Sequence, residues 1–463
     1  MAQQPFHKAQ AALSLFILTR WLRTLRGRTR DVALTSFLWL LAIWLPLWGA
    51  AGADPLDTDI ELWNKTTIGN ADGAKRGSKI TEHADLRLEV RYDPEGDFRA
   101  ELGGRLNLFS ANGAADDLAG EIELFKAYVE TADSSYSLRL GNQIVRWGKA
   151  DEISPLDNIN PEDWRDGFVR HRTERKLPLP MLNLELFRGA HTLQMLYAPI
   201  FLRSKIKLFD SNWAYFGAQA EPTAVHQDYS HGLNTGTFGS RLSGTIRGFD
   251  YSFSFLSAPT GLPSLKDLRP PLLGAPPAFS PSLADLADFA RRTGQEIEMA
   301  YHRRQILGFD FETVWEELGL RGDVAYVSRE DFFTGRLQAV REPVVRYVVG
   351  ADWSGVENCY VNLQFAQSVA LDWDAEILFA ERVSNGFYGE LSQEFYYHNL
   401  KSGVRALYDI NLGSYYYNPY LAINFWDQVN FELGLDLPGG PRDTIIGAYR
   451  NNRQGYLILR GYF

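Results

Sequence analysis

Residues 84–92, Ala-Asp-Leu-Arg-Leu-Glu-Val-Arg-Tyr, decide the fold of this chain because apolar and charged side chains alternate along them. A strand with this two-residue period has one apolar face and one charged face, as a strand between lipid and a wet lumen requires. After a turn at residues 93–97, rich in Asp, Pro and Gly, the alternation resumes over residues 98–108. Two such runs joined by a short turn predict a β-hairpin.

Similar pairs of runs follow along the whole chain. Short turns are expected at residues 132–135, 188–191, 247–249, 316–319, 355–358, 401–403 and 427–428, and long connections at 201–232, 259–298 and 370–388. Brief turns on one side and long loops on the other are typical of outer-membrane barrels. The sequence therefore predicts an all-β, antiparallel up-and-down transmembrane β-barrel of about 18 strands (16–18). A soluble β-sandwich is the alternative, but its loop lengths do not alternate so regularly.

Composition agrees with strands rather than helices. Aromatic residues make up 13% of the 463 residues, and the single cysteine, Cys359, permits neither an intramolecular disulfide nor a thiolate metal cluster. Beyond the first fifty or so positions, no stretch approaches the roughly 18 apolar residues of a helical span. Cys359 is expected as a small apolar residue at a strand end. A net charge of -10 argues against nucleic acid as a partner, and the chain is expected to need no cofactor.

The N-terminus predicts export. Basic residues precede an apolar run at 32–48, and Ala51-Gly52-Ala53 then offers a small-residue cleavage site. Residues 1–53 are therefore expected to be a signal peptide, with an over-extended start upstream of residue 30, and residues 54–463 the barrel. An N-terminal membrane anchor is the alternative. The expected location is the outer membrane of a Gram-negative bacterium, with its lipid and the barrel assembly machinery as partners. The terminal Phe463 resembles the assembly signal in part, since Gly461 stands where an apolar residue is preferred.

Two segments break the strand pattern. Residues 282–294 have helical spacing behind a capping Ser282, so we expect a short helix in a surface loop. Residues 149–180 are long and charged, and Asn160-Pro161-Glu162-Asp163 reads as a helix start. This segment either constricts the lumen or is a plain surface loop. The candidate residues of a constriction loop are Asp151, Glu152, Asp157, Asn160, Asp163 and Arg165. Its acids can also supply oxygen ligands to Ca²⁺, but EF-hand spacing is missing, so a solvated acidic loop is favoured and no metal is expected.

The charged face of the early strands supplies candidate pore-lining residues: Asp85, Arg87, Glu89, Arg91, Arg99, Glu101, Arg105 and Arg139. Both signs occur on neighbouring strands, so these side chains can pair as a ladder on the wall. Rings of charge also select among passing solutes.

A family resemblance starts at Gly141, Gln143 and Trp147-Gly148, and continues at Asn160-Pro161-Glu162-Asp163. With the run from Glu174 to Pro178, these motifs resemble a family of proteobacterial outer-membrane proteins known only as a domain of unknown function. Similarity to porin-like and alginate-exporter-like barrels is looser. The resemblance implies a barrel in the outer membrane and leaves the activity open.

The leading functional hypothesis is an outer-membrane channel or export porin for small hydrophilic or amphipathic solutes. The alternative is a structural barrel that scaffolds a periplasmic or surface partner, such as a surface polymer, a lipid-transfer protein or an electron-transfer subunit. The sequence has neither a Gly-x-Ser-x-Gly elbow nor a His-Glu-x-x-His pair, so we do not expect an enzyme. A serine and a histidine facing each other on the wall would favour one.

Overall fold

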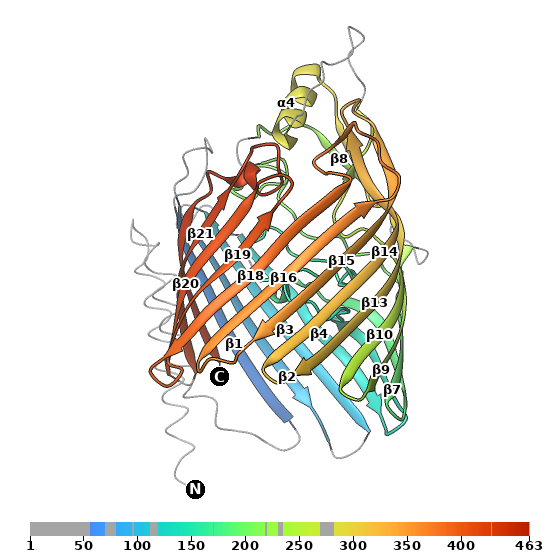
Figure 1. Cartoon of the computed structure of the whole chain (residues 1–463), viewed down its shortest axis with the longest axis vertical. Helices are drawn as coiled ribbons and strands as arrows, with labels where there is room; N and C mark the ends of the chain where they lie inside the picture. The colour runs from blue at the N-terminus through green and yellow to red at the C-terminus, as the bar shows by residue number, and fades with distance from the viewer. Residues whose placement is uncertain are drawn as a thin grey trace.

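The computed structural model describes residues 56–69, 80–94, 97–111, 119–169, 171–217, 220–229, 235–268, 282–426 and 428–462 (Figure 1). Within these ranges eighteen strands form one closed antiparallel sheet, in which each strand pairs with the strands before and after it. The last strand pairs with the first, with Gly461 opposite Leu62. The prediction of an up-and-down barrel of about 18 strands is therefore confirmed.

The first nine barrel strands are β1 (Leu56–Gly69), β2 (Ile80–Tyr92), β3 (Phe98–Ala111), β4 (Ala119–Ala132), β5 (Tyr136–Gln143), β6 (Leu179–Arg188), β7 (His191–Ala198), β9 (Thr237–Ile246) and β10 (Phe249–Pro259). The other nine are β13 (Arg303–Trp315), β14 (Leu318–Thr334), β15 (Ala339–Trp353), β16 (Cys359–Ala370), β18 (Val383–Phe395), β19 (Leu400–Asp409), β20 (Tyr415–Trp426), β21 (Val429–Gly439) and β22 (Gln454–Tyr462). Cys359 begins β16, as expected.

The outer surface of the barrel is apolar because every second side chain of each strand points outward. Ile122 is 85% exposed, and Leu102, Leu307 and Leu363 are each more than half exposed. Large apolar groups exposed to this extent would be unfavourable in water and are suited to lipid. The described helices are all too short to cross a membrane.

Five of the short turns lie where the sequence predicts them, and one prediction was wrong. The turns at 93–97 and 427–428 include residues 95, 96 and 427, which lie outside the described residues. Residues 401–403 belong to β19, and the turn is formed just before them by Tyr396, Tyr397 and His398, which have positive φ values. Gly403 looks like a turn residue, but it lies opposite Tyr420 in the sheet. A Cβ at position 403 would be 2.6 Å from that ring, so the glycine makes room for a tyrosine across the strands.

A small cap lies at the end of the barrel opposite the short turns (Figure 1). It consists of β8 (Val225–Asp228), β11 (Ser264–Leu265), β12 (Ile297–Ala300) and helix α4 (Leu283–Thr293). The side chain of Ser282 caps α4, so the predicted loop helix is confirmed. An apolar cluster joins the cap to the tip of β14, where β17 (Ile377–Leu378) also pairs. The remaining short elements are α3 (Arg172–Arg175) and a 3₁₀ turn, η4 (Gly447–Tyr449).

The predicted signal peptide and its alternative, the membrane anchor, lie outside the described residues, as does Phe463. They remain predictions.

Candidate functional site

One connection of the barrel, residues 144–178 between β5 and β6, folds inward, and we call it the inner segment. Hydrogen bonds and ion pairs join it to β2, β4, β13, β14, β16 and β22. Strands β2 and β22 flank β1, whereas β13 and β14 lie about halfway around the closed sheet. The inner segment therefore crosses the interior of the barrel from one wall to the other.

The inner segment begins with a tight turn against β14. Gly148 has a φ of 92°, and a Cβ there would lie 2.2 Å from Ser154 Oγ and 2.5 Å from Asp323 Oδ2. Only glycine combines this backbone conformation with so little space. The buried Asp323 carboxylate accepts hydrogen bonds from the Lys149 N–H at 2.7 Å and from the Ser154 hydroxyl at 2.5 Å. The glycine of the Trp-Gly motif is thus required by the attachment to β14.

Asn160 ties the two ends of the inner segment together. Its Oδ1 accepts a hydrogen bond from the Val145 N–H at 2.8 Å, and its Nδ2 donates to the carbonyls of Gln143 at 3.0 Å and Leu177 at 2.9 Å. All three partners are backbone groups. Buried backbone groups need such partners, so the side chain of Asn160 replaces secondary structure at this point.

The helix predicted to start at Asn160 is not formed. Glu162 and Asp163 instead make isolated β-bridges with Lys176 and Lys205. The physical reason is that the Asn160 amide bonds to distant backbone groups rather than capping the turn that follows it. The short helix of the inner segment is α3, near its other end.

An apolar core fixes the inner segment to one wall. Trp147 is 1% exposed, and its Nε1 donates to Gln194 Oε1 on β7 at 2.7 Å. The indole lies against β9, where a Cβ added to Gly239 would be 2.6 Å from the ring. The core comprises Val145, Trp147, Leu156 and Ile159 of the inner segment with Leu179, Met181, Leu196, Ala198, Leu256, Ala258, Ile306, Ala325 and Val327 of strands β6 to β14.

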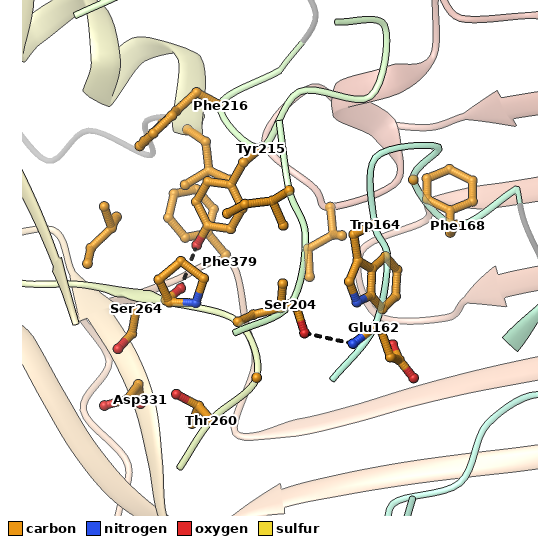
Figure 2. A pocket seen from close by; sticks show the side chains of 18 of the residues that line it. Glu162, Trp164, Phe168, Ser204, Tyr215, Phe216, Thr260, Ser264, Asp331 and Phe379 are labelled. Atoms are coloured by element: carbon orange, nitrogen blue, oxygen red, sulfur yellow. Dashed lines mark hydrogen bonds between the residues drawn. The ribbon is translucent and has the colours of Figure 1, made fainter. Parts of the chain in front are cut away.

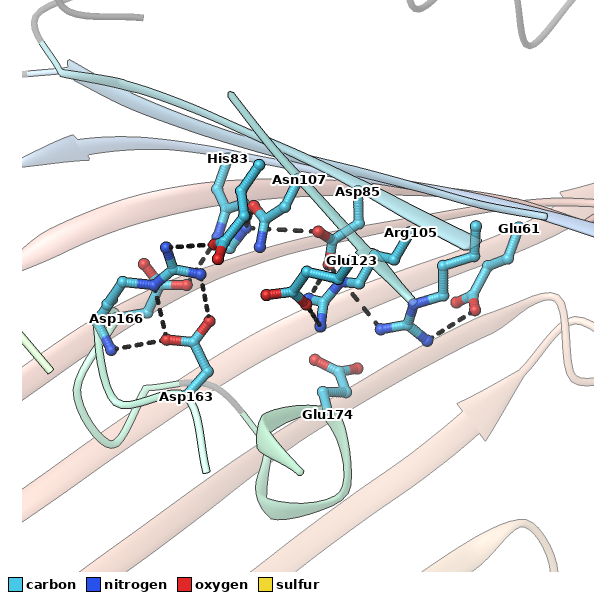
Figure 3. Close-up of polar contacts among 12 residues, drawn as sticks. Glu61, His83, Asp85, Arg105, Asn107, Glu123, Asp163, Asp166 and Glu174 are labelled. Atoms are coloured by element: carbon cyan, nitrogen blue, oxygen red, sulfur yellow. Dashed lines mark hydrogen bonds and ion pairs between the residues drawn. The ribbon is translucent and has the colours of Figure 1, made fainter. Parts of the chain in front are cut away.

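Polar contacts hold the inner segment to the opposite wall (Figure 3). Three pairs join the inner segment to β2, β4 and β22, with nitrogen–oxygen distances of 2.8, 3.1 and 2.5 Å: His83–Asp166, Arg165–Glu121 and Arg460–Glu174. One side of the inner segment is therefore packed in apolar side chains, and the other is held by hydrogen bonds and ion pairs.

The candidate residues of the constriction loop are spread along the inner segment rather than gathered in one ring. Asp151 accepts hydrogen bonds from Arg321 of β14 at 2.6 Å and from Asn362 of β16 at 2.7 Å. Glu152 lies 3.3 Å from the imidazole of His171. Each acid therefore has its own polar partner.

Asp157 and Asp163 are buried in the inner segment. The Lys176 ammonium lies 3.0 Å from Asp157, and Arg165 donates to both oxygens of Asp163. Burial disfavours the charged form of Arg165, but the hydrogen bond and charge of Asp163 outweigh it and raise the pKa of Arg165. In the described part of the chain, no three His, Cys, Asp or Glu side chains are grouped so as to hold a metal ion.

Most of the candidate pore-lining residues form a ladder of ion pairs across β1 to β5. Asp85 and Arg105 are both fully buried and form an ion pair with each other (Figure 3). The remaining pairs are Arg87–Glu61 at 2.9 Å, Glu89–Lys126 at 2.7 Å, Glu101–Lys126 at 2.9 Å and Arg139–Glu130 at 3.2 Å. Opposite charges on nearby strands therefore pair along this wall, and Lys126 is shared between Glu89 and Glu101.

Two candidates lie elsewhere. Arg99 is 57% exposed and pairs with Asp93 at the first short turn, and Arg91 pairs with the largely exposed Asp57. Both stand at the end of the barrel that carries the short turns, away from the inner segment.

Sequence reasoning missed a group of inward tyrosines on β18 to β22. Tyr416 and Tyr420 of β20 are buried, and Tyr456 of β22 donates a hydrogen bond to Glu432 at 2.7 Å. The Arg405 guanidinium lies 3.9 Å from the centre of the Tyr420 ring, which is a cation–π contact. Alternation of Tyr, Asn and Tyr at positions 416, 418 and 420 was the available signal, but aromatic residues also suit the lipid face.

A cavity of about 910 Å³ lies between the inner segment, the cap and β13 to β15 (Figure 2). Trp164 of the inner segment, Tyr215, Phe216 and Phe379 line it, and the Ser204 hydroxyl accepts a hydrogen bond from the Glu162 N–H at 3.0 Å. Burial raises the pKa of Tyr215 to about 12, so its hydroxyl stays protonated. Arg304, Glu330 and Arg346 also reach the cavity. It therefore combines an aromatic lining with charged groups.

A serine, a histidine and an aspartate do meet at this cavity. Ser264 Oγ is 3.2 Å and Asp331 Oδ1 is 2.8 Å from the same nitrogen, Nδ1 of His302. A catalytic triad needs the two partners on different ring nitrogens, so that one takes a proton while the other orients the ring. Ser264 also lies 3.1 Å from the Ala300 carbonyl oxygen, to which it donates. The geometry is that of a structural link between the cap and β14.

Comparison with known families agrees with this architecture. A family model described as "Protein of unknown function (DUF1302)" matches residues 64–347, which is more than half of the chain and includes the Trp-Gly and Asn-Pro motifs. No curated protein matches the chain.

The chain is similar to solved structures of low sequence identity. OccAB2 of Acinetobacter baumannii superposes with a TM-score of 0.50 at 10% identity, covering 89% of this chain and 98% of OccAB2. OccK5 (OpdH) of Pseudomonas aeruginosa gives a TM-score of 0.49 at 10% identity, covering 89% and 99%. Identity this low establishes a common fold alone. The chain is an outer-membrane β-barrel of a Gram-negative bacterium, with its outer face in lipid.

Proposed function

This chain belongs to the family described as protein of unknown function DUF1302, and we propose that it is a channel for small hydrophilic or amphipathic solutes. The observation that carries the proposal is the inner segment, which is attached to both walls without being part of the barrel wall. In the proposed channel this segment narrows the lumen. In the proposed channel, solutes pass between its polar side and strands β1 to β4 and β22.

The ion pairs on that side support the proposal. Residues on the ladder of β1 to β5 neutralise one another, so a passing solute meets many polar groups without a strong local field of one sign. Two of the constriction candidates face this wall, since Arg165 donates to Asp163 of the inner segment and to Glu121 of β4.

Conductance across a planar lipid bilayer tests the channel. We would compare the purified full-length barrel with a variant in which a short Gly-Ser linker replaces residues 149–171. The linker removes the attachments to β2, β4, β13, β14 and β16 but keeps Trp147 and the closing strands. We expect the native chain to conduct ions and the variant to conduct more. If neither conducts, the channel is refuted and the barrel is better explained as a scaffold for a partner.

A further inference from the structure

We propose that the cavity beneath the cap is a binding site for an amphipathic anion, whose charged group binds Arg304 and Arg346 and whose apolar part lies against the cap. This inference rests on the proposed channel and names the class of solute that it would receive. The cavity also borders Tyr449, in the connection between β21 and β22, and so reaches the side of the barrel where the proposed path lies. The cavity volume of about 910 Å³ lies within the usual range for small-molecule sites, roughly 300–1,000 Å³.

The cationic end of the site consists of two arginines that share one carboxylate. Glu330 of β14 lies 2.8 Å from Arg304 of β13 and 3.0 Å from Arg346 of β15. Arg304 also donates to Asn158 Oδ1 of the inner segment at 2.8 Å. Two guanidinium groups and one carboxylate leave a formal charge of +1, which persists at every ordinary pH because arginine does not deprotonate.

The nearby acids Asp331, Asp157 and Glu162 do not cancel this charge, because other cations lie beside them. Asp331 pairs with Arg341 at 3.1 Å. Asp157 and Glu162 share Lys176 at 3.0 and 2.9 Å, and Arg172 and Arg175 lie 3.5 Å from Asp157 and 4.0 Å from Glu162. The excess positive charge is therefore localised at Arg304 and Arg346, on the wall of the cavity. An uncompensated charge in such surroundings is unfavourable, and an anion that reaches it is bound strongly.

A bulge in β14 places the shared carboxylate. The register of β14 with β15 shifts between Val327 and Glu330, so that Ser328 and Arg329 stand against Pro343 alone. Proline has no N–H to donate, which favours a break in the ladder at this position. Bulges redirect the side chains that follow them, and here the next residue is the carboxylate that joins the two arginines.

The apolar end of the site is the underside of the cap. Phe216 and Phe333 are buried in the cap cluster, and Tyr215 and Phe379 are packed against it (Figure 2). All four side chains line the cavity. A fully hydrophilic solute would leave these aromatic faces without partners, whereas a neutral apolar solute would leave the arginine charge unused. A molecule with an apolar body and one anionic group satisfies both ends.

Binding of 10-bromodecanoate tests the site, because bromine quenches the fluorescence of nearby indoles and Trp164 and Trp213 line the cavity. The full-length barrel would be studied in nanodiscs of zwitterionic lipid. We expect saturable quenching by the carboxylate, with affinity about ten- to a hundredfold higher than for 10-bromodecanamide, as for the loss of one charge-assisted hydrogen bond. Equal affinity for the two probes, or quenching that does not saturate, would overturn the proposal.

The variant Arg346→Met should remove the preference for the carboxylate. This variant leaves Arg304 and Glu330 as a neutral ion pair, so no buried acid loses its partner and the barrel should stay folded. The matched control is Arg336→Met, on an exposed loop where the side chain is 71% exposed, and it should bind both probes as the native chain does. If Arg346→Met still binds the carboxylate more tightly than the amide, the anion binds elsewhere and the proposed site is wrong.

Membrane lipid and dissolved solute are the two sources of such an anion, and anionic phospholipid in the nanodisc separates them. Competition by phosphatidylglycerol supports the site with lipid as its ligand, and lack of competition supports it with a soluble amphiphile. Probe binding and conductance are measured independently, so the two proposals can fail separately. If the barrel conducts but does not bind the bromodecanoate probe, only the binding site is refuted. If it binds the probe but does not conduct, only the channel is refuted.

Discussion

Replacing Trp147 by alanine should loosen the inner segment from the wall without breaking the barrel. The indole is almost fully buried among residues of β6 to β14, and its N–H donates to Gln194. Truncation of a buried aromatic side chain costs roughly 3–5 kcal/mol, and the lost hydrogen bond adds about 1 kcal/mol. The expected loss in the free energy of unfolding is therefore roughly 4–6 kcal/mol.

The matched control is Trp315→Ala. Trp315 is 71% exposed on the outer face of β13, so its removal takes away no contact with the inner segment. Urea unfolding in lipid vesicles, followed by far-ultraviolet circular dichroism, compares the two variants without relying on tryptophan fluorescence. Planar-bilayer recordings should show larger and noisier conductance for Trp147→Ala than for Trp315→Ala. Equal unfolding energies and equal conductance in the two variants would refute the role assigned to the apolar core.

Two further predictions concern single residues. Gly148→Ala should destabilise the chain by roughly 2–4 kcal/mol, because the methyl group would overlap neighbouring oxygens. The control Gly189→Ala, at a turn with open space around it, should cost only the backbone strain of about 1–2 kcal/mol. Comparable losses of the free energy of unfolding in urea would argue against the tight attachment of the inner segment to β14. Arg105→Ala should cost roughly 3–5 kcal/mol because it removes the cation of a fully buried ion pair. Arg99→Ala, at an exposed pair, should cost about 0–1 kcal/mol. Similar unfolding midpoints for the two variants would contradict the burial of the Asp85–Arg105 pair.

The motifs of the inner segment are explained by contacts that no local pattern reveals. Asn160 was predicted to cap a helix because Asn-Pro followed by acids is typical of a helix start. Its amide instead bonds to Val145, Gln143 and Leu177. A capping preference depends only on the residues that follow Asn160. It cannot predict that the side chain will bond to backbone groups 15 to 17 residues away, because those bonds form only with the tertiary structure.

The cavity could not be predicted at all. Arg304, Glu330 and Arg346 belong to three strands, and each looked like an ordinary inward polar residue of its own strand. Their meeting depends on the register of β13, β14 and β15 and on the bulge near Glu330. Register is set by pairing between strands, which the alternation within one strand does not specify.

The sequence by itself determined the barrel, its strand number and which face of most strands is apolar. These follow from a two-residue period and from loop lengths, both of which are local properties that must hold in every strand that borders lipid. Only the tertiary structure decided what fills the lumen. The inner segment is positioned by contacts such as Lys149 with Asp323, which are 174 residues apart, and contacts at that separation exist only after the sheet has closed.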